Sequence, residues 1–190
     1  MNLFEELANI LLPDADRMRA LRAVQSLNLP DCWIGAGFVR DAVWDRLHGY
    51  AVCPPKGDID VVWFDRQQTG IDNDLENALA ALDPDFTWSV KNQARMHLHN
   101  GDAPYQAVSD AMRFWPEIAT AVAVRLTNRN VLEINAPLGL NDLFALRLRP
   151  TSAFKIEKQD IFLGRIADKR WLHRYPHLQL QYMPTKEAAK

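Results

Sequence analysis

Two aspartates separated by one residue are the clearest chemical signal in the sequence. Asp58 and Asp60 flank Ile59 at the start of a strand-forming run that continues to Phe64. Alternate side chains of a strand point to opposite faces, so both carboxylates lie on one face while Ile59 points into the core. Like charges this close are costly unless a cation lies between them. The spacing therefore indicates a site where two acids share a metal ion.

A glycine turn lies a short way before this pair. Gly35, Ala36 and Gly37 follow a buried strand predicted over residues 32–34 and open a helix predicted over 37–48. The start of a helix directs backbone N–H groups and positive charge at an anion, so a phosphate could bind there, with Arg40 in reach. The alternatives are a glycine pair that only makes a tight turn and an arginine that only pairs with a neighbour.

Glu133 is the best-placed candidate for a third carboxylate. It lies mid-strand in a predicted antiparallel hairpin of residues 120–126 and 131–135, with apolar neighbours on the opposite face. We expect its strand to lie beside that of Asp58 and Asp60, so that three carboxylates hold two metals roughly 3.5–4 Å apart. A separation above roughly 8 Å would favour a silent binding module instead. The other alternative is an exposed polar position on an edge strand.

A polar segment follows a strand predicted over residues 86–90. Lys91, Asn92 and Arg95 are candidate substrate contacts, because binding sites are often built where a strand gives way to a loop. The alternative is an ordinary surface turn.

An aromatic and basic cluster lies near the C-terminus, formed by Trp171, His173, Arg174 and Tyr175. It could stack on a nucleobase. The alternative is a tryptophan that anchors a terminal helix to the core.

Length and patterning predict one domain over residues 1–190. Two N-terminal helices are expected within residues 1–30, with Asp14 capping the second. A helix over 73–82, a short helix over 107–114 and a helix up to residue 148 follow in the chain. Asn141 or Asp142 is expected to cap the start of the last of these, and Asp142 is read as a cap rather than as a catalytic acid. Residues 151–190 are expected to form an amphipathic helix over 156–172 and a tail over 184–190 packed on the domain.

Composition excludes several classes of protein. Of the 190 residues, 48% are hydrophobic and 24% charged, which argues against long disorder, and the net charge of −2 provides no general attraction for nucleic acid. The N-terminus has no basic leader, and no apolar run is long enough to span a membrane. Cys32 and Cys53 match no zinc or disulfide pattern. We therefore expect a cytoplasmic protein.

The motifs together resemble a known superfamily. Gly37-Phe38-Val39-Arg40-Asp41, a helix ending in Leu47-His48-Gly49, and Asp58-Ile59-Asp60 followed by hydrophobic residues are similar to the core of DNA polymerase beta-like nucleotidyltransferases, especially the CCA-adding and poly(A) polymerase branch. The runs from Trp88 to His97 and from Ala136 to Phe144 resemble a small bacterial group described as nucleotidyltransferase-like. The resemblance extends from about residue 21 to 176.

The resemblance implies an α+β fold with a mixed sheet packed with helices. It also implies two Mg²⁺ (or Mn²⁺) ions held by Asp58, Asp60 and Glu133, and a nucleoside triphosphate whose phosphates lie against Gly35–Gly37. The implied reaction transfers a nucleoside monophosphate to an unknown acceptor, which is a small molecule, a protein or RNA. Ala36 departs from the family pattern, because a glycine usually stands there. This departure supports the alternative of a catalytically silent nucleotide- or partner-binding module.

Overall fold

The computed structural model describes residues 2–68 and 70–182, and the predicted tail over 184–190 lies outside them. The helices are α1 (Leu3–Leu11), α2 (Ala15–Ser26), α3 (Gly37–Leu47), α4 (Asp72–Leu82), α5 (Met96–Asn100), α6 (Val108–Met112), α7 (Asn141–Phe144), α8 (Gln159–Lys169) and α9 (Trp171–Arg174). The strands are β1 (Trp33–Gly35), β2 (Asp58–Trp63), β3 (Thr87–Asn92), β4 (Ala123–Leu126), β5 (Leu132–Asn135), β6 (Arg147–Leu148) and β7 (Gln179–Leu180). Short 3₁₀ helices span Gln93–Arg95, Ile118–Thr120 and Ser152–Phe154.

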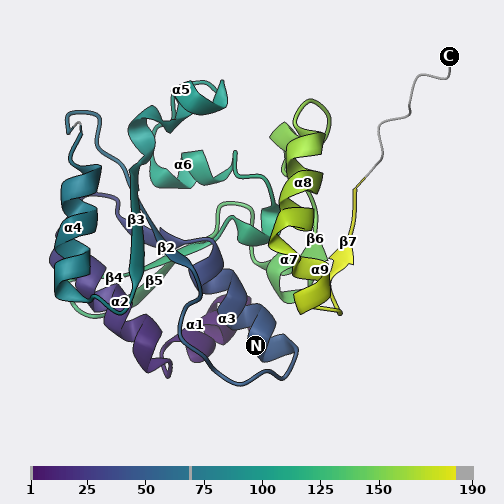
Figure 1. Ribbon diagram of the computed structural model, residues 1–190, viewed down its shortest axis with the longest axis horizontal. Helices are drawn as coiled ribbons and strands as arrows, with labels where there is room; N and C mark the ends of the chain where they lie inside the picture. Colours follow the sequence, from purple (N-terminus) through teal and green to yellow (C-terminus); the bar gives the residue numbers. More distant parts are fainter. Residues whose placement is uncertain (1, 69, 183–190) are drawn as a thin grey trace, which may run out of the picture.

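Five strands form one mixed sheet in the order β3-β2-β1-β4-β5. Strand β1 pairs antiparallel with both β2 and β4, while β2 and β3 run parallel. The predicted hairpin of β4 and β5 is confirmed as antiparallel. Helix α4 flanks the sheet on one side, and α8, α9, β6 and β7 gather on the other (Figure 1). The mixed sheet with packed helices confirms the predicted fold class.

The two faces of the sheet are covered unequally. Ile59, Val61 and Trp63 of β2 are buried in the main core, which α1 to α4 and the C-terminal helices complete. The other face carries a smaller cluster that includes Trp33, Val62, Val108, Met112 and Ala123. The alternation of residues in β2 therefore sends Asp58 and Asp60 to the less covered face, as predicted.

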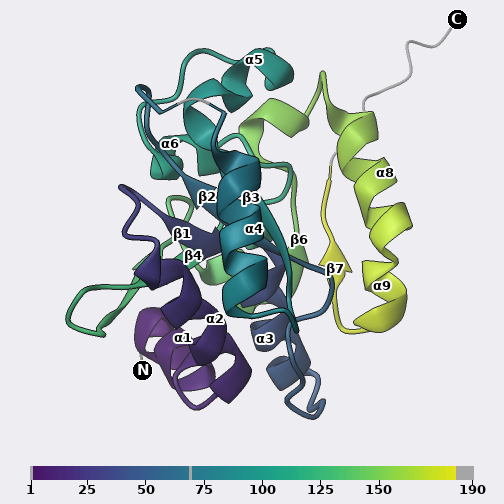
Figure 2. The same cartoon turned by 60° about the vertical axis from the view of Figure 1, so that its left-hand side comes forward.

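Two predicted helices near the C-terminus differ from the structure. The helix predicted up to residue 148 stops at Phe144, and Leu148 lies in β6. The helix predicted over 156–172 is divided, because Arg170 takes a left-handed conformation with φ 51° between α8 and α9. This break turns Trp171 and Tyr175 into the core, where both are buried. Figure 2 shows α8 and α9 on the side of the molecule away from α1 and α2.

Helix α2 begins at a capping aspartate. Asp14 caps α2 as predicted, because its side chain accepts a hydrogen bond from the Arg17 N–H. Among residues 2–68 and 70–182, no helix combines the length and the apolar character needed to cross a membrane.

Candidate functional site: an acid pair beside the start of a helix

Asp58 and Asp60 begin β2 and face the same side of the sheet. Asp58 is exposed, Asp60 is half-buried, and Ile59 between them is buried in the core. Asp60 lies opposite Ser89 in β3, and the antiparallel register of β1 with β2 continues so that Gly35 faces Asp60 from the other side. The acid pair and the glycine turn are therefore neighbours in space.

The electrostatic surroundings of Asp60 combine burial, a neighbouring acid and three cations. Burial raises the pKa of Asp60 above its ordinary value, and the negative charge of Asp58 raises it further. Three positive side chains act in the opposite direction, namely Arg40, Lys169 and Arg165. A carboxylate pair in which Asp58 makes the ionisation of Asp60 more costly, with cationic side chains nearby, can hold a divalent metal and the phosphate groups that bind to it.

The glycine turn contains a strained alanine. Ala36 has φ 51° and ψ −120°, a conformation that glycine adopts easily and that an L side chain rarely adopts. Its carbonyl accepts hydrogen bonds from the N–H groups of Val39 and Arg40, which start α3, and its own N–H donates to Val122. The first turn of α3 leaves the N–H groups of Gly37 and Phe38 without an intrahelical acceptor, so these two donors are available to a ligand.

The two glycines of the turn have different roles. A Cβ atom at Gly35 would meet the Trp115 ring at 2.8 Å, so this glycine makes room for a tryptophan. A Cβ atom at Gly37 would come within 3.2 Å of the Arg40 guanidinium, which therefore reaches back over the start of its own helix. Of the predicted contacts, Gly35 is explained by packing against Trp115, whereas Gly37 lies at the start of α3 beside the Arg40 guanidinium.

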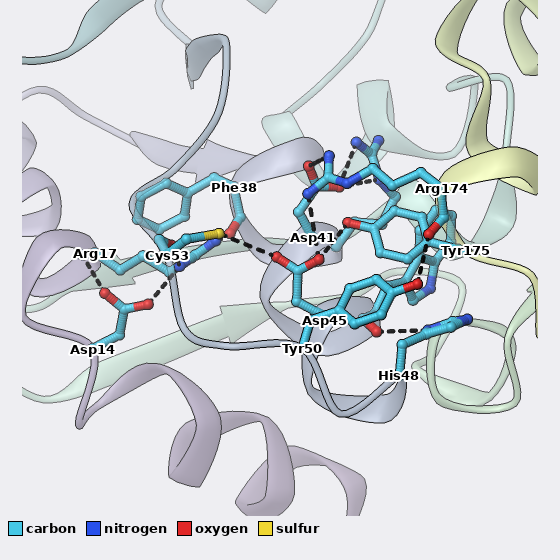
Figure 3. Close-up of polar contacts among 12 residues, drawn as sticks. Asp14, Arg17, Phe38, Asp41, Asp45, His48, Tyr50, Cys53, Arg174 and Tyr175 are labelled. Atoms are coloured by element: carbon cyan, nitrogen blue, oxygen red, sulfur yellow. Dashed lines mark hydrogen bonds and ion pairs between the residues drawn. The ribbon is translucent and has the colours of Figure 1, made fainter.

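Arg40 is held by a network that also fixes the C-terminal helices. Its guanidinium contacts Asp41 at 2.7 Å and lies 4.6 Å from the centre of the Trp171 ring. Asp41 also pairs with Arg174 at 3.1 Å, and Figure 3 shows these two side chains meeting above α3. Trp171 thus anchors the terminal helices, which is the second of the two predicted alternatives, and it does so through the arginine of the site.

Glu133 lies away from the acid pair, and the prediction that its strand neighbours β2 is wrong. Strand β5 is the sheet edge, separated from β2 by β1 and β4. Three strand spacings of about 4.8 Å place Glu133 roughly 14 Å from the axis of β2. Glu133 instead pairs with Arg125 across the hairpin at 2.7 Å. It has the correct face, but the pairing of β4 with β5 places it too far away to share metals with Asp58 and Asp60.

The strand predicted to end at residue 90 continues to Asn92 as β3, and the polar segment at its end is largely engaged within the protein. Asn92 is buried, and its amide binds the backbone of Asp65, Gln68 and Ala94, which holds the loop after β2. Lys91 pairs with Glu76 of α4 at 3.1 Å. Arg95 donates to the Gln68 carbonyl at 3.1 Å. These contacts explain Asn92 as a structural residue, so we do not carry it into the site.

Asp142 is a structural residue of another kind. Its buried carboxylate accepts two hydrogen bonds from Arg149, each 2.7 Å long, and Leu140 occupies the cap position of α7. The sequence prediction of a helix cap is therefore wrong, although Asp142 is not part of the site either.

The site includes two residues of α8 that sequence reasoning missed. The positive charges of Arg165 and Lys169 lower the pKa of Asp60. Arg165 also pairs with the buried Glu117 at 2.8 Å. Their spacing of four residues is the one signal that could have found them, since it places both on one side of a helix together with the buried Phe162 and Ile166.

The donor set fits a magnesium ion that completes its coordination with substrate. Mg²⁺ prefers oxygen ligands and usually takes one or two carboxylates, substrate phosphates and water. Asp58 and Asp60 provide such a pair. In the described part of the chain, no three His, Cys, Asp or Glu side chains are grouped to enclose an ion. The acid pair therefore fits a metal bound together with a phosphate, rather than an ion enclosed by protein.

The fold and the acid pair beside a helix start define a nucleotidyltransferase of the polymerase beta-like class, as the motifs predicted. A family model described as Nucleotidyltransferase matches residues 22–180, so the chain belongs to that family. It is similar over 94% of its length to a protein whose NMR structure reveals a CCA-adding enzyme head domain, with 31% identity and a TM-score of 0.82. The match covers 96% of that protein.

Larger enzymes share the fold at lower identity. The Thermotoga maritima CCA-adding enzyme complexed with tRNA matches with 16% identity and a TM-score of 0.58, over 93% of this chain and 42% of that enzyme. A tRNA-processing enzyme with CTP matches with 18% identity and a TM-score of 0.51, over 85% of this chain and 43% of the enzyme. The chain thus spans less than half of these enzymes. No curated protein sequence matches significantly.

Proposed function

We propose that the protein transfers a nucleoside monophosphate from a nucleoside triphosphate to an acceptor, with Mg²⁺ or Mn²⁺ held by Asp58 and Asp60. The observation that carries this proposal is the acid pair, because Asp58 makes the ionisation of Asp60 more costly and neither carboxylate has an ion-pair partner among the described residues. By contrast, the acids that serve only the fold are in ion pairs, as Asp14 is with Arg17 and Asp142 is with Arg149.

The chain's own residues would bind and orient the nucleotide. The N–H groups of Gly37 and Phe38 and the guanidinium of Arg40 would hold the phosphates, and Asp41 with Trp171 would keep Arg40 in place. When bound, the metal would neutralise charge at the transferred phosphorus and lower the pKa of the acceptor hydroxyl. Lys91 and Arg95 stay candidate substrate contacts, outside the immediate site.

The nucleotide is the better supported of the two substrates. The similar enzymes include one complexed with CTP and one complexed with tRNA, and both contain more chain than is present here. The net charge of −2 offers no general attraction for RNA, so a small molecule, a protein side chain and RNA are equal candidates for the acceptor. A cytoplasmic location and a bacterial source stay predictions.

A silent nucleotide-binding module is the second candidate. The position of Glu133 favours it, because the third carboxylate of a two-metal site is not where the sequence predicted it. The strained Ala36 favours it as well, because its methyl group lies in the turn that approaches the phosphates. In an active enzyme, the ligands that Glu133 does not provide for two ions would have to come from the substrate or from water.

Two measurements test the proposal. Saturating ATP, CTP, GTP or UTP with Mg²⁺ should raise the melting temperature, since a hundredfold excess over Kd stabilises a protein by about 2.7 kcal/mol. Incubation of the purified protein with labelled nucleotides and cell extract should then label an acceptor. Binding without labelling would favour the silent module, and the absence of any nucleotide binding would contradict both candidates.

A further inference from the structure

We propose that Lys169, the last residue of α8, is a substrate-binding residue that contacts the phosphate groups of the nucleotide. The inference rests on the proposed function, because it names a further contact for the same substrate. It would make the C-terminal helices part of the binding site in addition to their role in packing.

Lys169 belongs to the face of α8 that is turned toward the core. Phe162 and Ile166 are buried on this face. Lys169 follows Phe162 by seven positions and Ile166 by three, and the repeat of 3.6 residues places all three on one side of the helix. Lys169 itself is exposed, so it projects from the end of the packed face and its ammonium group is accessible to a ligand.

The end of α8 is held next to the start of α3. Lys169 is followed by the left-handed Arg170 and then by the buried Trp171, whose ring lies 4.6 Å from the Arg40 guanidinium. Arg174 then pairs with Asp41 in the first turn of α3. Two contacts that follow Lys169 by a few residues thus hold it beside the helix start and the arginine that would bind phosphate.

The other cations that fasten this segment are occupied. Lys158, Arg165 and Arg174 pair respectively with the core acids Asp102, Glu117 and Asp41, and each of these acids is less than one-tenth exposed. Within the described residues, Lys169 makes no ion pair shorter than 4.0 Å. It is therefore a cation of the docked segment whose charge is not consumed by docking.

The charge of Lys169 also acts on the carboxylate of Asp60. Among the side chains that lower the pKa of Asp60, Lys169 ranks directly after Arg40 and before Arg165. Arg40 belongs to α3 and Lys169 to α8, so two separate elements contribute positive charge near Asp60. An ammonium group is a compact point charge with three donors, and such groups bind phosphate without requiring a planar partner.

Nucleotide titration of Lys169→Ala provides the first test. Its Kd for each of the four Mg²⁺–nucleotide complexes should be about tenfold weaker, equivalent to about 1.4 kcal/mol, which is typical for a lost charged hydrogen bond. Lys169→Arg should keep most of the affinity. The control is Lys155→Ala, which removes an exposed lysine of the same C-terminal segment and should leave the Kd unchanged. Unliganded Lys169→Ala should melt at the wild-type temperature.

A second test separates contact with phosphate from an effect on Asp60. Inorganic tripolyphosphate in EDTA is titrated into Asp60→Asn and into the double variant Asp60→Asn/Lys169→Ala. A direct phosphate contact should still weaken binding about tenfold in this background. Loss of the effect would show that Lys169 acts only through Asp60, and would overturn the inference.

The remaining outcomes are equally decisive. Wild-type binding of nucleotide with an unchanged Kd for Lys169→Ala would overturn the inference and leave the proposed function standing. Failure of the wild-type protein to bind any of the four nucleotides would overturn the proposed function, and the inference with it. A lower melting temperature for unliganded Lys169→Ala, with unchanged Kd, would assign Lys169 to packing.

Discussion

Two groups of aspartates lie near α3, and their surroundings are opposite. Asp41 and Asp45 of the helix are buried and paired with cations, since Arg174 contacts both (Figure 3). Arg40 also contacts Asp41. Asp58 and Asp60 of β2 have no such partners at contact distance among the described residues, and they repel each other. The helix acids hold the protein together, whereas the strand acids are arranged for a ligand.

The helix acids also show what a satisfied site looks like. Asp45 accepts a hydrogen bond from the Tyr175 hydroxyl at 2.8 Å in addition to its contact with Arg174. Burial raises the pKa of Tyr175, and the charge of Asp41 and the hydrogen bond to Asp45 raise it further, so Tyr175 stays a neutral donor. Every polar group in this network has a partner, which is the normal condition of buried polar groups. The contrast can be tested by changing each group in turn.

The largest effect is expected from the strand acids. Asp58→Asn and Asp60→Asn should each lower nucleotidyl transfer by about a thousandfold, because each removes a metal ligand at the reacting phosphate. Both variants should unfold in urea at the same or a higher concentration than the metal-free wild-type protein, since like-charge repulsion is relieved. Earlier unfolding would instead show that these acids support the fold.

A smaller effect, and one on stability, is expected from the helix acids. Asp41→Asn should lower the free energy of unfolding by about 3 kcal/mol, because it leaves buried Arg40 without its charge partner. The control is Asp85→Asn, whose side chain is 71% exposed and pairs with Arg19 at the surface. It should change stability by less than about 0.5 kcal/mol. Equal effects in urea unfolding would remove the distinction between the two groups.

Ala36 provides a test of strain between the two groups. Ala36→Gly should raise the free energy of unfolding by about 1 kcal/mol. An L residue at positive φ costs about 1–2 kcal/mol, and the greater conformational entropy that glycine gives the unfolded chain offsets part of the relief. The sequence alone would suggest a small loss of stability. Nucleotide affinity should rise as well if the methyl group restricts the phosphates. Thermal unfolding and titration of the same variant measure both.

The pH dependence of stability should report the raised pKa of Asp60 in the metal-free protein. Because the folded-state pKa of Asp60 is raised above 3.8, the metal-free protein loses stability as the pH rises from about 3.8 through that pKa. The free energy of unfolding of Asp60→Asn should therefore rise relative to that of the wild type over this pH window, and the two proteins should not differ in this respect at lower pH. Asp58→Asn should narrow the window, because it removes the second cause of the shift. Urea unfolding between pH 3.5 and 7, roughly the range over which a carboxylate titrates, tests this.

The smallest effect is expected from Glu133→Gln. Glu133 and Arg125 are 42% and 36% exposed, so the loss of their ion pair should cost less than about 1 kcal/mol. Transfer activity should stay within about twofold of the wild type, since the carboxylate lies too far from β2 to bind the same metals. A loss beyond tenfold would mean that Glu133 joins the acid pair after all, and that the hairpin moves when substrate binds.

The sequence alone determined the features that depend on near neighbours. The period of two in β2 placed Asp58 and Asp60 on one face, and the turn before α3 placed Gly37 and Arg40 at a helix start. Asp14 was recognised as a cap from its position before a helical pattern. These features follow from local backbone geometry, which a short stretch of sequence contains in full.

Only the tertiary structure decided which segments became neighbours. The alternation of residues around Glu133 indicated its face correctly, but strand order depends on pairing between distant segments, and β4 and β1 separate β5 from β2. The same reason applies to Asn92 and Lys169, because their neighbours come from distant parts of the chain. Asn92 binds the backbone of the loop after β2, and Lys169 acts on Asp60 from α8. Periodicity states which way a side chain points, whereas the packing of the whole chain decides what it meets.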